Sequence, residues 1–283
     1  MALPEDFRRE SRRRWGEQAA GWDSQREALR TRTMPVAAWM IDAIDPQPGQ
    51  TLLELAAGTG DTGLLAAELV APTGTLISSD FAPEMLQAAQ RRAEELGITN
   101  VRFKQIDADT SIDVEAGSVD GVLCRWGYML MADPGNALRE TRRVLRPGGR
   151  VALAAWAAPE TNPWMSLPTR EAVEGGLLDP PDPAQPGPFS WAREGLIAEQ
   201  LEAAGFTEHH VEALDFPIDF RSPAEWWTQT TACSGRFAAA VAAAPDDAID
   251  DLAAALDEHA ERFRRQDGTL RLPARTWVAW AAA

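Results

Sequence analysis

Residues 52–63 read LLELAAGTGDTG, an apolar segment that runs directly into a glycine-rich one. The apolar half has the composition of a buried strand, and a helical pattern begins after the glycines. Gly58, Gly60 and Gly63 match the spacing GxGxxG. Glycines at such a junction let the backbone turn tightly and approach a ligand closely. The segment therefore predicts a strand, a ligand-binding turn and a helix.

Two kinds of nucleotide ligand are compatible with this turn. Asp80 ends the next predicted strand about 20 residues beyond the second glycine, where dinucleotide-binding folds place an acid for the ribose hydroxyls. Glu54, however, lies in the strand just before the turn. It would repel a pyrophosphate, because like charges about 4 Å apart cost about 4 kcal/mol at an effective dielectric of 20. The carboxylate favours S-adenosylmethionine, which carries an ammonium and a sulfonium with one carboxylate.

Predicted strands and helices alternate through the body of the chain. The strands are expected at 51–56, 75–79, 101–106, 119–124 and 150–156, and the helices at 62–70, 83–96 and 135–145. Such alternation is typical of a parallel sheet covered by helices. The segment 143–150, RVLRPGGR, is expected to be a helix stop and turn that supplies backbone freedom and no chemistry.

The flanking segments predict a cap. Helices are expected at 7–22, 34–44, 190–204, 223–243 and 246–266, and strands at 209–220 and 269–281, which would pair and complete the sheet. Residues 159–190 hold too many prolines for a strand or a continuous helix and predict a surface excursion or lid. We expect N-terminal cap helices (1–44), a cofactor-binding core (45–158), and a third part containing the lid, late strands and cap helices (159–283).

Composition excludes several classes of protein. The chain has 283 residues and a formal net charge of −16, which disfavours a nucleic-acid partner. No apolar run approaches the roughly 18 residues of a membrane span, and no secretory signal precedes the first predicted helix, so a cytoplasmic protein is expected. The two cysteines and three histidines lack metal-site spacing, so no metal is expected. The arginines at 8, 9, 12, 13 and 14 are expected to form a solvated helix face.

Four segments together resemble a known family. They are ELAAGTGDTG (54–63), SSDFAPEML (78–86), FKQIDADT (103–110) and the block VDGVLCRWGYMLMADPGNALRETRRVLRPGGRV (119–151). In sequence and spacing they resemble class I S-adenosylmethionine-dependent methyltransferases, and most of all the ubiquinone/menaquinone-biosynthesis-like small-molecule group. The resemblance covers about residues 35–158. It implies a doubly wound Rossmann-like α/β fold with a seven-stranded sheet in the order 3-2-1-4-5-7-6 and a helical cap.

The resemblance also implies a set of cofactor-binding residues. Against the methionine part it places Ala56, Gly58, Thr59 and Gly60, with Glu54 nearby. Asp80 would accept the ribose hydroxyls, and Phe81 and Met85 would pack on the adenine. Asp107 and the backbone of Ala108 would contact the adenine edge. Arg125 stands where relatives usually have a small polar residue, so its role is open between a backbone contact to the methionine part and a side chain that reaches substrate.

The acceptor side is less determined. Trp22, Trp126 and Tyr128 are candidate substrate contacts. The eleven tryptophans of the chain suit a flat-walled pocket for an aromatic or polyketide-like acceptor, and simple packing is the alternative for each of the three residues. His259 and Tyr128 are weak candidates for a general base, and His259 also fits an apolar helix stripe. A base is optional, since in-line methyl transfer depends mainly on positioning and exclusion of water.

The expected function is methyl transfer to a small, apolar or aromatic acceptor. Two alternatives stay open: a protein of the same fold that binds S-adenosylmethionine or S-adenosylhomocysteine without methyl transfer or with another reaction, and an NAD(P)-dependent oxidoreductase. The sequence does not determine the acceptor, the atom methylated or the oligomeric state.

Overall fold

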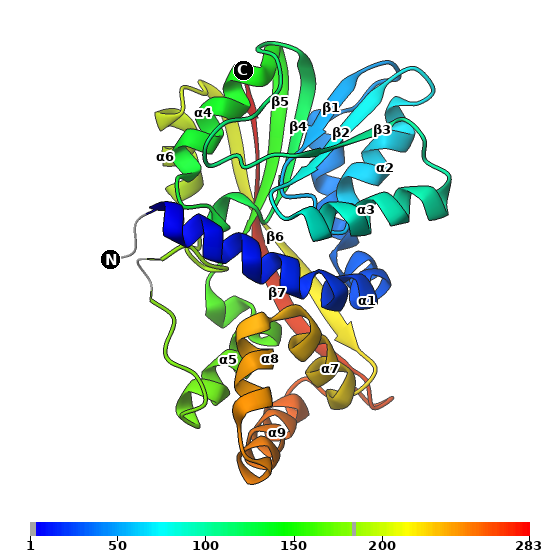
Figure 1. The fold of residues 1–283 in the computed structure, drawn as a ribbon. Coiled ribbons are helices and arrows are strands. Elements are labelled where there is room, and N and C mark those ends of the chain that lie inside the picture. Colours follow the sequence, from blue (N-terminus) through cyan, green and yellow to red (C-terminus); the bar gives the residue numbers. More distant parts are fainter. Residues whose placement is uncertain (1–3, 183–184) are drawn as a thin grey trace.

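A seven-stranded sheet forms the centre of the computed structural model, in the order β3-β2-β1-β4-β5-β7-β6 (Figure 1). The structure describes residues 4–182 and 185–283, so residues 1–3 of the predicted N-terminal cap and Pro183 of the predicted excursion lie outside the described residues. The observed strand order is the one that the family resemblance implies.

The strands at the centre of the sheet form where the sequence is most continuously apolar. The seven strands are β1 (Thr51–Glu54), β2 (Thr75–Asp80), β3 (Val101–Gln105), β4 (Val119–Arg125), β5 (Leu145–Trp156), β6 (Glu208–Phe220) and β7 (Leu270–Ala282). The first five are parallel, and β7 pairs antiparallel with both β5 and β6. Consecutive residues such as Val122 and Leu123 are buried, because helices cover both faces of a parallel sheet.

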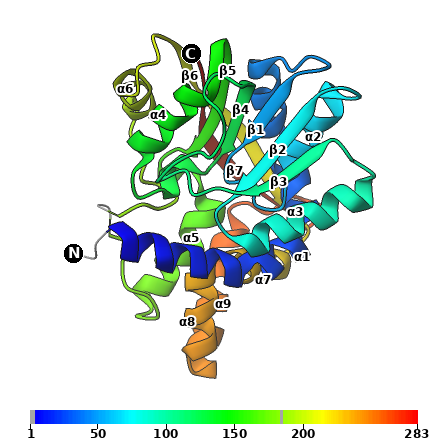
Figure 2. The same ribbon diagram turned by 45° about the horizontal axis from the view of Figure 1, so that its top comes forward.

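Helices cover the sheet on both faces. The crossover helices are α2 (Asp61–Val70), α3 (Pro83–Leu96), α4 (Pro134–Val144) and α6 (Leu196–Ala203). Strand order reverses direction between β1 and β4, so right-handed crossovers place α2 and α3 on one face and α4 on the other (Figures 1 and 2). The predicted helix at 190–204 is shorter than expected, because it begins only after Gly195, whose φ is +83°.

Helix α1 (Pro4–Ile44) is a single helix of 41 residues, where the sequence predicted two. The segment between the two predicted helices has no apolar stripe but contains no helix breaker. Its charged side chains pair with α3 instead: Asp23 with Arg91 at 2.9 Å, Arg26 with Glu95 at 2.6 Å and Glu27 with Arg92 at 2.6 Å. These ion pairs hold the polar middle segment of α1 against α3. The hydrophobic periodicity of the sequence does not reveal such contacts.

The cap lies on the far side of α1 from most of the sheet (Figures 1 and 2). It contains α5 (Pro163–Glu174), α7 (Pro223–Cys233), α8 (Gly235–Ala243) and α9 (Asp246–Glu261). Two short 3-10 turns, η1 (Tyr128–Leu130) and η2 (Pro159–Thr161), follow β4 and β5. The sequence missed α5, which tolerates Pro163 at its first turn and Pro168 inside. The predicted helix 223–243 is broken at Ser234, whose hydroxyl accepts the Phe237 N–H and begins α8. Within residues 4–182 and 185–283, every helix is too short or too polar to cross a bilayer.

Candidate functional site

The carboxyl ends of β1, β2, β3 and β4 meet at one edge of the sheet, where open α/β sheets bind their ligands. The turn from β1 to α2 lies there. Ala56, Gly58 and Gly60 have positive φ values of 51°, 55° and 87°. A Cβ on Gly58 would meet nothing within 4 Å. The turn therefore exposes open backbone at Gly58, next to Thr59, which is buried.

Glu54 lies beneath this turn. Its Oε1 accepts the Gly63 N–H at 2.7 Å and its Oε2 accepts the Ser78 hydroxyl at 3.2 Å. Burial raises the pKa of Glu54 to about 7, although the Gly63 N–H and the charge of Arg125 lower it. An ideal Cβ on Gly63 would lie 2.1 Å from Oε2, so the third glycine makes room for this carboxylate. The carboxylate of Glu54 thus accepts the N–H of Gly63, in the first turn of α2, where a pyrophosphate would otherwise bind.

Asp80 joins the end of β2 to the same turn. Its Oδ2 accepts the Gly58 N–H and its Oδ1 accepts the Ala82 N–H, both at 2.9 Å. Burial raises the pKa of Asp80 to about 6, and the backbone hydrogen bonds oppose that shift. The structure therefore brings Asp80 and Gly58 into direct contact, and the role of Asp80 at the ribose of a cofactor stays a prediction.

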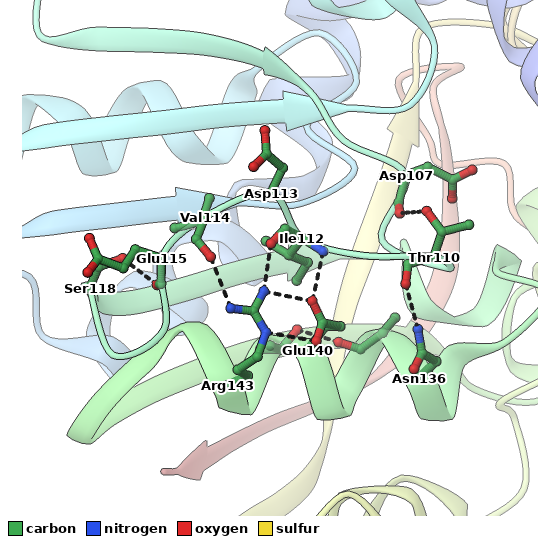
Figure 3. Close-up of polar contacts among 12 residues, drawn as sticks. Asp107, Thr110, Ile112, Asp113, Val114, Glu115, Ser118, Asn136, Glu140 and Arg143 are labelled. Carbon is green, nitrogen blue, oxygen red and sulfur yellow. Dashed lines mark hydrogen bonds and ion pairs between the residues drawn. The ribbon is translucent and has the colours of Figure 1, made fainter.

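Asp107 follows β3, in the loop that leads to β4. Its carbonyl accepts the Thr110 N–H at 3.0 Å and the Thr110 hydroxyl at 2.9 Å. Asn136 of α4 donates its side-chain amide to the carbonyls of Asp109 and Thr110, both at 3.1 Å. In Figure 3 the Asp107 carboxylate points away from this network. The main chain at Asp107 is therefore fixed on one side while its carboxylate points away from these contacts, and neighbouring Ala108 is buried.

Arg143 of α4 holds the middle of this loop (Figure 3). Its guanidinium donates to the carbonyls of Ile112 at 2.7 Å and Val114 at 3.1 Å, and also to Glu140. Glu140 in turn accepts the Ile112 N–H at 3.0 Å. The sequence analysis expected no chemistry from the segment that begins at Arg143. No local signal could have revealed this role, since the acceptors are backbone carbonyls about thirty residues earlier.

Replacing Arg143 with methionine is expected to lower the free energy of unfolding by about 1–2 kcal/mol. Two loop carbonyls would lose charge-assisted donors, and the partial exposure of the guanidinium keeps the loss moderate. The change is measured from urea-denaturation midpoints. Arg139→Met, on an exposed position of the same helix, is the control and should change the midpoint little. Equal midpoints for the two variants would contradict the interpretation that Arg143 stabilises the loop through the carbonyls of Ile112 and Val114.

Arg125 ends β4 and connects three elements. Its guanidinium donates to the Thr33 hydroxyl of α1 at 2.6 Å, and its Nη2 lies 3.5 Å from Oδ2 of Asp61 at the start of α2. The Cζ atom lies 4.8 Å from the centre of the Trp126 ring, a cation–π contact. The guanidinium is therefore held between Thr33, Asp61 and Trp126, and both roles left open for Arg125 stay predictions.

An aromatic cluster, defined as Trp126, Trp156, Trp164 and Phe216, follows the carboxyl ends of β4 and β5. Trp126 and Trp156 stack at 4.2 Å with 13° between their planes. Trp156 meets Trp164 of α5 edge-on at 5.4 Å and Phe216 at 6.1 Å. Trp126 has a φ of +58°, and its indole N–H donates to Thr276 at 3.1 Å. The cluster therefore adjoins the turn through Arg125 and reaches the cap through Trp164 of α5.

Comparison with known proteins identifies the family. A model described as a methyltransferase domain matches residues 46–173. The chain is 32% identical over 199 residues to nocamycin O-methyltransferase of Saccharothrix syringae, an alignment that covers 67% of this chain and 70% of that protein. The chain belongs to the class I S-adenosylmethionine-dependent methyltransferases. Its cofactor is therefore S-adenosylmethionine, and the NAD(P) alternative is wrong.

Other relatives match the methyltransferase over shorter or more distant alignments. Demethylmenaquinone methyltransferase of Thermus thermophilus is 39% identical over 124 residues, and the alignment covers 43% of this chain and 55% of that relative. Among solved structures, YcgJ of Bacillus subtilis superposes with a TM-score of 0.55 at 21% identity, covering 87% of this chain and 97% of that one. The [4+2]-cyclase SpnF gives a TM-score of 0.51 at 15% identity, covering 92% and 93%. These structural likenesses show the shared fold.

The methyltransferase does not bring the two base candidates to the glycine turn. The Tyr128 hydroxyl is buried 2.6 Å from Thr141 of α4, and its ring stacks on Trp191, so this side chain packs on the opposite face. His259 lies between α5 and α9 in the cap, where its Nε2 is 2.9 Å from Glu171. Figures 1 and 2 both place α9 at the end of the cap far from the sheet. Packing and hydrogen bonding account for both side chains.

Trp22 lies on the face of α1 that covers the start of α3. It packs with Ala19 and Trp15 against Phe81, Ala82 and Met85. Its indole N–H donates to the carbonyl of Cys233 at the end of α7 at 3.1 Å. Trp22 therefore joins the cap to the predicted adenine end, and Met85 is buried beneath it.

Proposed function

We propose that this methyltransferase transfers a methyl group from S-adenosylmethionine to a small, apolar or aromatic acceptor held between the glycine turn and the cap. One observation carries the proposal: Arg125 contacts Asp61 at the end of the glycine turn and lies over Trp126, the first ring of the aromatic cluster. The cofactor end and the aromatic cluster thus share one side chain. The names of the relatives, nocamycin O-methyltransferase and demethylmenaquinone methyltransferase, support a small-molecule acceptor.

The residues at the sheet edge fit a cationic cofactor. The backbone at Gly58 is open, and buried carboxylates of Glu54, Asp61 and Asp80 surround the turn. The residues proposed to hold the cofactor share this edge or the segments that follow it: Ala56, Gly58, Thr59 and Gly60 at the methionine part, Asp80 at the ribose, Phe81 and Met85 beside the adenine, and Asp107 with Ala108 at its edge. Glu54 holds the turn from below. Asp80 accepts two N–H groups and keeps lone pairs for ribose hydroxyls.

The chemistry then depends on positioning. S-adenosylmethionine supplies a methyl group on a sulfonium, and the chain supplies a dry, shaped site. Alignment of donor and acceptor alone can provide effective molarities on the order of 10⁵ M, so no dedicated base is required. We propose that residues 45–158 hold the cofactor, and that the N-terminal cap helices (1–44) exclude water and bind the acceptor together with the lid and cap helices of 159–283, whose late strands complete the sheet.

The test combines binding with product formation. S-adenosylhomocysteine binding is measured by calorimetry, and transfer from methyl-labelled S-adenosylmethionine is followed over a panel of phenols, naphthols and flat polycyclic hydroxy-ketones. We expect labelled product from at least one flat acceptor, and a higher KM for that acceptor in Trp126→Ala with little change in the KM for the cofactor. Tight S-adenosylhomocysteine binding with no product across the panel would favour the alternative of a cofactor-binding protein with another reaction.

Cofactor affinity is expected to fall below neutral pH. A ribose hydroxyl donates to the ionised form of Asp80, and burial raises the pKa of this carboxyl to about 6. Protonation removes the acceptor, so the affinity for S-adenosylhomocysteine should decrease by about tenfold between pH 7 and pH 5. Calorimetry across this range measures the profile. The Asp80→Asn variant should bind more weakly and show a flatter profile; an unchanged profile would assign the titration to another group, such as Glu54.

A further inference from the structure

One row of α1 side chains faces the predicted adenine end of the site. The row is spaced by three or four residues, as one helix face requires, and consists of Arg8, Arg12, Trp15, Ala19 and Trp22. Its apolar members pack against Phe81 and Ala82, directly after β2. Its two arginines therefore lie one to two helical turns further along the same face, toward the loop that follows β3.

Both arginines reach Asp107. Arg12 donates from Nη2 to Oδ2 of Asp107 at 3.1 Å, and the Nε of Arg8 lies 3.8 Å from the same oxygen. The Cζ of Arg12 lies 5.9 Å from the centre of the Phe81 ring. The Asp107 side chain is only 18% exposed. The arginines thus span the two side chains that the proposed function places against the plane and the edge of the adenine.

The contacts leave one carboxylate oxygen for another donor. Both arginines approach Oδ2 and no residue in the described part of the chain is placed against Oδ1, so Oδ1 remains available to accept a hydrogen bond. The main chain of Asp107 is already fixed by Thr110. Holding the side chain as well removes rotamer freedom that binding would otherwise have to remove. An ionised oxygen in this position accepts from an exocyclic amine and repels a carbonyl oxygen.

We propose that Arg8 and Arg12 are positioning residues for adenine recognition: they hold Asp107 by Oδ2 and leave Oδ1 to accept the exocyclic amine of the purine. The inference rests on the proposed cofactor site. Through these two arginines, α1 would contribute to the preference for adenine over a 6-oxopurine, in addition to its packing against the cap.

The same helix offers matched controls. Arg9 and Arg13 lie beside this row on α1, where Arg9 pairs with Asp6 at 2.6 Å and Arg13 pairs with Glu10 at 2.7 Å and Glu17 at 2.5 Å. Replacing Arg13 with methionine removes a charge of the same sign, one residue away, without touching Asp107. Arg12→Met keeps much of the apolar stem and removes the guanidinium.

The experiment compares two ligands that differ only at the purine C6 substituent. S-adenosylhomocysteine carries an amine there, and S-inosylhomocysteine carries an oxygen. Affinities are measured by calorimetry for the full chain, Arg12→Met, Arg12→Lys, Arg13→Met and Asp107→Ala. We expect the unmodified protein to prefer the adenosyl ligand. Arg12→Met should weaken binding of that ligand by about fivefold to tenfold and of the inosyl ligand by less than twofold, since the net contribution of one hydrogen bond corresponds to about that change in affinity.

The other variants complete the comparison. Arg12→Lys should retain part of the preference, Arg13→Met should retain all of it, and Asp107→Ala should abolish it. Equal weakening of both ligands in Arg12→Met would assign Arg12 to helix packing and overturn the inference. Unchanged or tighter adenosyl binding would also overturn it, and the tighter result would show that the guanidinium blocks the site. Failure of the unmodified protein to bind S-adenosylhomocysteine would refute the proposed function itself.

Discussion

Replacing Asp80 with alanine is expected to weaken S-adenosylhomocysteine binding by about tenfold to 150-fold, or roughly 1.5–3 kcal/mol. Hydrogen bonds to an ionised carboxylate are worth more than neutral ones, and two ribose hydroxyls would lose theirs. The loss has a second part in this protein, because Asp80 also accepts the N–H groups of Gly58 and Ala82. Without the carboxylate the turn is less fixed at the point where the ligand approaches. Calorimetry measures the affinity.

A control for the Asp80 variant is Asp113→Ala. Asp113 lies in the loop after β3, but its side chain is 86% exposed and pairs with Lys104 at 2.7 Å. Removing it changes the net charge equally and should alter the affinity by less than about twofold, because exposed pairs contribute little. Unchanged affinity in Asp80→Ala would mean that the glycine turn does not hold the ribose end of the cofactor.

Gly21→Ala is expected to lower the free energy of unfolding by about 1–3 kcal/mol or more, although alanine favours helix. An ideal Cβ at Gly21 would lie 2.0 Å from the carbonyl oxygen of Ala232 in α7. The obstacle is backbone, so α1 and α7 must move apart. That movement would also strain the hydrogen bond from Trp22 to the Cys233 carbonyl, which joins the cap to α1. Urea denaturation measures the change.

Gly16→Ala is the matched control on the same helix. Its ideal Cβ would lie 2.6 Å from Oε2 of Glu84, which is the end of an exposed, flexible side chain. Glu84 can turn away at little cost. Alanine should then stabilise α1 by about 0.5–1 kcal/mol through its higher helix propensity. Shifts of the same sign in both variants would contradict the interpretation that backbone contact between α1 and α7 distinguishes the two glycines.

The arginines of α1 show which contacts composition and spacing can predict and which they cannot. The sequence predicted a solvated basic face, which describes Arg9, Arg13 and Arg14: they pair with acids of their own helix. It was wrong for Arg8 and Arg12, which face Asp107 nearly a hundred residues later. Which arginine faces inward depends on the phase of the helix against the sheet. That phase is set by the packing of Trp15 and Trp22 on the start of α3.

The sequence by itself determined the parallel core, the glycine turn and the acids that follow β2 and β3. Those features are local: continuous apolar runs form buried strands, and glycines permit positive φ where a strand turns into a helix. Only the tertiary structure decided that Glu54 turns inward to Gly63, that Arg125 joins the turn to Trp126, and that α1 lies between sheet and cap. Each of these depends on contacts between residues distant in sequence, and side-chain direction there follows from packing and burial of charge, which no local pattern records.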